Sequence, residues 1–278
     1  MTERFAFWNR RRRVLAALAV SALLLLLLTL LGSGWAAEAI LTDFSRKNLP
    51  PSSGCLFGTD WLGRDMVKRT VAGLSRSIRL GAVTAAISAV LAFLLGTAAA
   101  LFGDLADRAV SGIIDLVMSI PHMLLLILIS CAMGKGVTGV SVGIALTHWP
   151  SLARLIRAEV LQLKNSQFVR VSEKLGMSRF QIAWEHLLPH LVPQFVTGLV
   201  LLFPHAILHE ASITFLGFGL PPEEPAIGII LSESMKYLIT GKWWLAVFPG
   251  LSLVAAVLLF QWLGQSLGSL IDPGSAHE

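Results

Sequence analysis

Long apolar runs alternate with short polar segments along most of the chain. Six runs approach or reach the length of a membrane-crossing helix, at about residues 14–31, 80–102, 109–133, 137–153, 191–215 and 244–263. A transmembrane helix needs about 20 predominantly apolar residues. The pattern therefore predicts an all-α, polytopic membrane protein with about six transmembrane helices.

The first apolar run directly follows four arginines, Arg10 to Arg13. A cleaved signal peptide is one alternative, with Ala36 and Ala37 near a cleavage site. The run is long for the apolar core of a signal peptide, however, and many further runs follow it. We therefore expect a retained first helix whose N-terminus lies in the cytoplasm.

The charge content fits a membrane protein. Only 14% of the residues are charged, against roughly 25% in soluble domains. The net charge of +5 comes from basic residues that flank apolar runs, which favours membrane orientation over nucleic-acid binding. Orientation by positive charge places residues 154–189 and both termini in the cytoplasm, but the basic residues within 46–76 disagree with it. Cys55 and Cys131 lie in a loop and an apolar run, so we expect no disulfide and no cysteine metal site.

Residues 168–189 form a charged, amphipathic island between two apolar runs. Gly176 permits a sharp bend between two short helices, and Pro189 is expected to end the second one and return the chain to the membrane. Such a pair of helices can lie in a groove of a partner protein. A solvated loop without a partner is the alternative.

Four segments give the chain a resemblance to a known family. They are Gly58-Thr-Asp-Trp-Leu-Gly-Arg-Asp65, residues 168–189, residues 207–219 with the sequence Ile-Leu-His-Glu-Ala-Ser-Ile-Thr-Phe-Leu-Gly-Phe-Gly, and Phe248-Pro-Gly250 together with Ile271-Asp-Pro273. In this order, they resemble the inner-membrane permease subunits of binding-protein-dependent ABC importers in the dipeptide, oligopeptide and nickel group. The resemblance implies a type I ABC importer permease fold. An N-terminal span and external segment would occupy residues 1–75, and a permease core with a cytoplasmic coupling loop at 154–189 would occupy residues 76–273.

The coupling loop is similar to the family's "EAA" loop, which implies contact with a separate ATPase. The residues expected to make or shape this contact are Arg170, Ser172, Glu173, Gly176, His186 and Pro189. The chain departs from the family here, because Arg170-Val171-Ser172 stands where Glu-Ala-Ala is usual. This puts the usual acidic contact in doubt, although Glu173 is near enough to replace it.

The resemblance also implies where ATP is bound. No Gly-x-x-x-x-Gly-Lys-[Ser/Thr] phosphate loop occurs in the sequence, so we expect ATP on the partner subunit and no cofactor on this chain. The implied partners are a second homologous permease, two ATPase subunits, an extracytoplasmic solute-binding protein and the lipid of the inner membrane, with no nucleic acid. Two further departures, residues 225–228 without a tryptophan and Gln261 and Gln265 in the last run, remove no span or turn.

The signature before the second run mixes turn formers with charges. Its candidate residues are Gly58, Asp60, Gly63, Arg64 and Asp65. We expect a structured turn in which the two aspartates and the arginine form hydrogen bonds or ion pairs. Two roles stay open: contact with the partner permease or binding protein, and a folded loop that caps the second helix.

Polar side chains within the apolar runs are candidates for a substrate path, because such groups tend to face a cavity or a neighbouring helix. His205 and His209 lie four residues apart and share one helical face, so they are the candidate metal ligands. The alternative is that both form hydrogen bonds to neighbouring helices. The other candidates on the path are Glu210, Asp115 and His122, and His148 also lies in a run. We expect Asp115 to pair with another helix.

A His-x-x-x-His pair at this position is similar to the nickel permeases. The sequence therefore leads us to expect a permease that translocates nickel or another transition metal, as a chelate, by ATP-driven alternating access. A di- or oligopeptide importer permease is the alternative, and a stand-alone channel or ion-driven carrier is a remote one. We do not expect an enzyme, because Ile213 stands where the zinc motif His-Glu-x-x-His needs its second histidine.

Overall fold

The structure, a computed structural model, describes residues 10–271, so the Asp272-Pro273 end of the tail motif lies outside the described residues. In chain order the helices are α1 (Arg10–Gly34), α2 (Met66–Leu101), α3 (Asp104–Ser119), α4 (His122–Ala132), α5 (Gly136–Lys164), α6 (Gln167–Lys174), α7 (Arg179–Ile182), α8 (Leu188–Phe215), α9 (Ile227–Leu238) and α10 (Trp244–Ile271). Short 3-10 turns at Glu38–Ile40 and Phe44–Arg46 follow α1, and a π-helical stretch, Ala183–Leu187, joins α7 to α8. The predicted all-α class is confirmed.

Four helices of residues 10–271 are long and apolar enough to cross a membrane. They are α1, α2, the continuous helix over Phe180–Phe215 and α10, and the bent pair of α3 and α4 makes a fifth crossing if it counts as one span. The 29-residue α5 is also long enough, but glycine, threonine and histidine make it less apolar than the other four. The six predicted runs therefore all become helices, with one of them broken.

The broken run is the predicted third span, 109–133. It forms two helices that meet at an angle of 96°. Pro121 accounts for the break, because a proline pushes the residue before it out of the helical region, and Ile120 has an extended ψ of 135°. The predicted third span is therefore a broken pair of helices. As a consequence, His122 becomes the first residue of α4.

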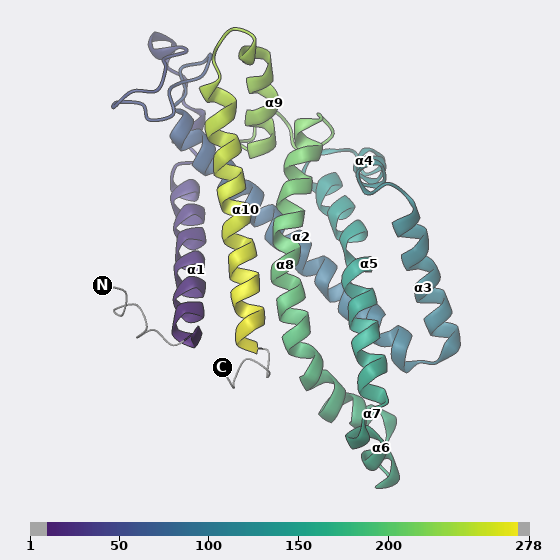
Figure 1. Ribbon diagram of the computed structural model, residues 1–278. Helices are drawn as coiled ribbons and strands as arrows, with labels where there is room; N and C mark the ends of the chain where they lie inside the picture. The colour runs from purple at the N-terminus through teal and green to yellow at the C-terminus, as the bar shows by residue number, and fades with distance from the viewer. Residues whose placement is uncertain (1–9, 272–278) are drawn as a thin grey trace.

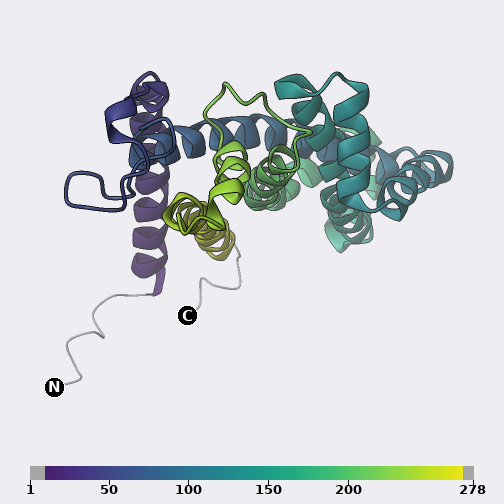
Figure 2. The same cartoon turned by 90° about the horizontal axis from the view of Figure 1, so that it is seen from above.

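The central helix of the molecule is α2, which crosses behind α10, α8 and α5 in Figure 1 and packs along α1, α5 and α8. Its buried face carries small side chains, including Ala85, Ala89 and Ala92, which let helices approach closely in a membrane. Ser88 on the same face donates a hydrogen bond to the Ala145 carbonyl of α5 at 2.9 Å. Both views place α1 and α3 at opposite edges of the molecule (Figure 2).

Different segments of the chain lie at the two ends of the bundle. The loop between α1 and α2 lies with α9 at the upper end in Figure 1. The start of α1, the end of α10 and the short helices α6 and α7 all lie toward the lower end. This is the relative arrangement that the sequence predicts for the island and the terminal helices.

The coupling loop predicted at 154–189 consists of two structural parts. Residues 154–164 continue α5, so the separate part begins with α6. Gly176 has a φ of +84°, which a glycine adopts without strain, and it makes the bend between α6 and α7 as predicted. Pro189 does not end a helix: it directly follows the π-helical stretch, as the second residue of α8, inside the continuous helix Phe180–Phe215.

Candidate functional site

The coupling segment, defined here as residues 167–187, is held together from within. Ser172 is buried, and its hydroxyl donates a hydrogen bond to the Phe168 carbonyl at 2.9 Å and lies 3.2 Å from His186 Nε2. The His186 ring also meets the Phe168 ring edge-on. Ser172 and His186 therefore connect the two halves of the segment across Gly176.

The outer surface of the coupling segment is partly apolar. Arg170 and Glu173, two of the predicted contact residues, are exposed. Beside them Leu175, Phe180 and Trp184 are 79%, 76% and 65% exposed, and the Phe180 and Trp184 rings stack at 6.5 Å. Large apolar side chains gathered on a surface mark an interaction site. These three side chains were not among the predicted contact residues, although large apolar residues within a charged island were a signal that could have indicated them.

The signature loop folds around the buried carboxylate of Asp60. This carboxylate accepts hydrogen bonds from Arg64 Nε at 2.6 Å and Arg69 Nη1 at 2.9 Å, and also from the backbone N–H groups of Leu62 and Arg64. Arg69 in turn pairs with Glu233 of α9. The loop is therefore fixed both to α2 and to α9.

The remaining signature residues shape the turn. Asp65 caps α2, because its side chain accepts hydrogen bonds from the backbone N–H groups of Val67 and Lys68. Gly63 has a φ of +78°, and a Cβ atom there would lie 1.7 Å from the Asp43 carbonyl oxygen. The predicted hydrogen bonds of Asp60, Arg64 and Asp65 are confirmed. Arg69 and Glu233 complete the cluster; nothing in the local sequence of α9 pointed to Glu233.

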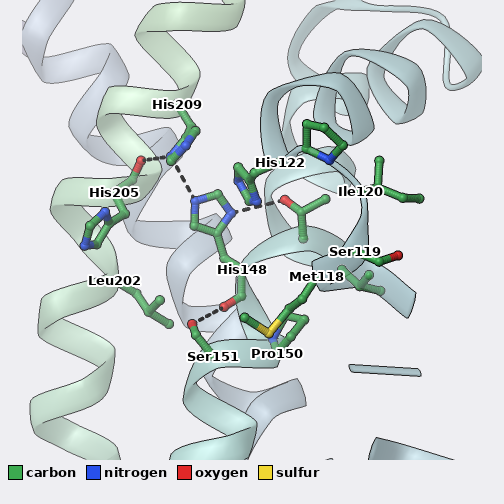
Figure 3. Close-up of a pocket in the computed structure, with 13 residues that line it drawn as sticks. Met118, Ser119, Ile120, His122, His148, Pro150, Ser151, Leu202, His205 and His209 are labelled. Atoms are coloured by element: carbon green, nitrogen blue, oxygen red, sulfur yellow. Dashed lines mark hydrogen bonds between the residues drawn. The ribbon is translucent and has the colours of Figure 1, made fainter. Parts of the chain in front are cut away.

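A cavity of about 710 Å³ opens between the junction of α3 and α4, α5 and α8. Its walls include residues 117–122, Thr147, His148, Pro150 and Ser151 of α5, and Leu202, His205 and His209 of α8. Figure 3 shows three imidazole rings converging at one end of this cavity. No carboxylate is among the described lining residues.

The three rings belong to His122, His148 and His209, one from each of α4, α5 and α8. Their centroids lie 4.5–4.8 Å apart, and one ligand nitrogen from each lies within 4.8 Å of the others. His148 Nε2 is 3.2 Å from His209 Nδ1. This spacing makes the cluster a candidate metal site.

The residues predicted to line the substrate path do not all lie together in the structure. His205 lines the cavity but stands apart from the three rings (Figure 3). Glu210 is fully buried away from the cavity and accepts a hydrogen bond from Thr214 at 3.0 Å. Asp115 pairs with Arg154 of α5 at 2.8 Å, as predicted for an interhelical contact, and does not line the cavity. Helical spacing relates His205 to His209, whereas the imidazole rings nearest to His209 come from α4 and α5.

Comparison with known proteins gives three findings at the sequence level. The family described as "Binding-protein-dependent transport system inner membrane component" matches residues 88–274. The "Dipeptide transport system permease protein DppC" of Bacillus subtilis (strain 168) is 30% identical over 269 residues, which cover 96% of this chain and 84% of the relative. A relative from Brucella suis biovar 1 (strain 1330), provisionally named a peptide permease, is 34% identical over 232 residues, covering 83% of this chain and 77% of its own.

The fold is also similar to a solved structure. A chain of the MetNI methionine ABC transporter in an inward-facing conformation superposes with a TM-score of 0.62. The match has 20% sequence identity and covers 74% of this chain and 98% of that chain. The likeness supports the helical permease architecture that the sequence motifs implied.

Proposed function

The chain belongs to the family of binding-protein-dependent transport system inner membrane components, and we propose that it serves as one permease subunit of an importer for di- or oligopeptides. Membership makes it a multi-pass inner-membrane protein that works with an ATPase and a binding protein. It is not a catalytic subunit, and ATP is hydrolysed on the partner. The observation that carries the peptide assignment is the 30% identity, over 96% of the chain, to a dipeptide permease.

The cavity between α4, α5 and α8 is the candidate part of the translocation path. Exposed apolar side chains such as Leu116, Leu124 and Leu128 lie on the neighbouring α3 and α4. We place a second, homologous permease on this side of the molecule, so that the path lies between the two subunits. Alternating access then means that the cavity opens in turn toward each side of the membrane.

The coupling segment is suited to drive this motion. Asn165 and Ser166 join its first end to α5, and its second end continues into α8 within one helix. A 28-residue helix is about 42 Å long, so a displacement at α7 is carried deep into the bundle. The segment thereby connects an ATPase to the two helices that hold His148 and His209.

The orientation follows from the same reasoning. ATP is available in the cytoplasm, so the coupling segment would face the cytoplasm together with the start of α1 and the end of α10. The signature loop and α9 would then face the outer side, where a binding protein delivers the solute. This placement assigns the signature residues Gly58 to Asp65 to the outer end of the permease.

Solute uptake tests the assignment. We expect cells that lack this chain to lose uptake of a labelled dipeptide, to regain it with the wild-type chain, and to take up radioactive nickel unchanged. The comparison must use the same cells at the same external concentrations. Dipeptide uptake that does not depend on the chain would contradict the peptide proposal.

Nickel or another chelated transition metal is the second candidate solute. The three imidazoles at the cavity favour it, because imidazole nitrogen is a good ligand for nickel, zinc and copper. The same cells decide between the two. A loss of nickel uptake without a loss of dipeptide uptake would replace the first candidate with the second.

A further inference from the structure

We propose that His122, His148 and His209 form a binding site for one divalent transition-metal ion, with Ni²⁺, Co²⁺ and Zn²⁺ as the fitting class. The role of the site in transport rests on the second candidate solute above. Metal binding itself does not, because it follows from the arrangement of the three side chains.

The distances suit a metal of this class. Zinc–nitrogen bonds of about 2.0–2.1 Å in a tetrahedral site separate two ligand nitrogens by about 3.3 Å. His148 Nε2 and His209 Nδ1 are 3.2 Å apart. The third nitrogen lies within 4.8 Å of both. A turn of the His122 ring toward the other two therefore completes a three-ligand set.

His148 already has the orientation of a metal ligand. Its Nδ1 lies 3.0 Å from the Ile144 carbonyl oxygen, which can only accept a hydrogen bond. Nδ1 therefore carries the hydrogen in the neutral ring, and Nε2 presents its lone pair to the cluster. A ligating histidine commonly donates its other N–H to a backbone carbonyl in this way.

His209 would respond to the metal by a change of tautomer. Its Nδ1 donates to the His205 carbonyl at 2.7 Å and faces His148 Nε2 at 3.2 Å. With a metal bound, this hydrogen would leave Nδ1, and the ring would turn from the His205 carbonyl toward His148. The proton of His209 would then lie on Nε2, and the Nδ1 lone pair would point at the metal.

One feature of His122 has no explanation if the three histidines serve only to hold the helices together. Its Nε2 atom is buried, and within residues 10–271 no hydrogen-bond partner lies in reach. Leaving a buried polar atom unpaired destabilises a protein. A bound metal ion would give this nitrogen a partner.

The cavity adjoins the site and leaves a coordination position open. All three histidines line it, and no carboxylate is among the described lining residues. Three neutral imidazoles leave the charge of a divalent ion uncompensated, so a fourth ligand from the cavity would be an anionic group of a solute or chelator. Sites with three protein ligands and one open position are those that exchange ligands.

Direct metal binding tests the proposal. The full chain, purified in its assembled transporter in detergent and free of chelators, is titrated with Ni²⁺ by calorimetry and with Co²⁺ by visible absorption. We expect one ion per copy of the chain. The variants His122→Ala, His148→Ala and His209→Ala should each bind at least about tenfold more weakly, since even changes to the partners of metal ligands have effects of this size.

Two controls distinguish loss of the metal site from other effects of the substitutions. His205→Ala removes an imidazole from the same cavity but outside the cluster, and it should bind metal like the wild type. Size-exclusion profiles identify variants that fail to fold, and for such a position the smaller change His→Asn is used in its place. Absence of stoichiometric binding by the wild type, or an equal loss in His205→Ala, would overturn the proposal. Either result would leave the dipeptide uptake experiment untouched.

Discussion

Arg69 of α2 and Asp60 of the signature loop carry opposite charges, and their side chains are only 3% and 0% exposed. The Asp60 carboxylate also accepts from Arg64, and Arg69 reaches Glu233. Taking two charges out of water is unfavourable unless both are paired and hydrogen-bonded. The Asp60 carboxylate is the acceptor that both arginines share, so the loop between α1 and α2 depends on it.

Replacing Asp60 with asparagine removes one partner of the buried pair. We expect Asp60→Asn to lower the free energy of unfolding by about 1.5–3 kcal/mol, the value of a hydrogen bond between charged groups, because Arg69 keeps Glu233 as its other partner. Thermal unfolding of the detergent-solubilised transporter measures this. Glu38→Gln is the matched control, since it breaks the exposed pair with Lys68 and should change little. Equal effects of the two substitutions would contradict the role given to Asp60.

The coupling segment is the element on which the mechanism depends. Its inner side is fixed by Ser172 and His186, and its outer side exposes Phe180 and Trp184. Aromatic side chains with this exposure dominate many protein interfaces. The charged residues Arg170 and Glu173 lie in the same segment and would surround such a contact.

Truncating the two aromatic side chains should release the ATPase. We expect the double variant Phe180→Ala, Trp184→Ala to retain its fold and to reduce co-purification of the ATPase at least about tenfold, the change that 1.4 kcal/mol of lost binding gives. Quantitative co-purification from membranes measures it. Ile239→Ala serves as the control, because Ile239 is 92% exposed just after α9, which lies at the opposite end of the molecule (Figure 1). Undiminished association of the double variant would exclude these side chains from the contact.

Elements that depend on local sequence were predictable. The apolar runs became α1, α2, α5, α8 and α10, and Gly176 made the predicted bend. The helix boundaries were predicted wrongly at two prolines, where a single residue decides the local structure. Pro121 broke an apolar run that hydropathy alone reads as continuous, and Pro189 was tolerated in the first turn of α8.

The candidate site was less predictable, because it depends on packing between distant segments. Spacing along one helix can relate His205 to His209, but it cannot show that His122 and His148 lie beside His209 across 87 and 61 residues. The same holds for Arg69 and Glu233. Residues that cap or bend a local turn, such as Asp65, carried a signal that short-range rules could use.

In the proposed transporter, the whole molecule forms one half of the translocation path. α1 and α3 form its edges, α2 is its central helix, and the histidine-lined cavity lies between α4, α5 and α8. The chain has no phosphate loop, and the family assigns ATP hydrolysis to another subunit. A stand-alone channel or carrier would need neither a coupling segment with an exposed aromatic surface nor a partner.

Uptake into proteoliposomes tests this claim most directly. The measurement compares the purified chain alone with the chain assembled with its second permease, its ATPases and its binding protein, using a labelled dipeptide and ATP. The account predicts uptake only by the full assembly and only while ATP is hydrolysed. Uptake by the chain alone, or uptake by the assembly that continues without ATP hydrolysis, would contradict it.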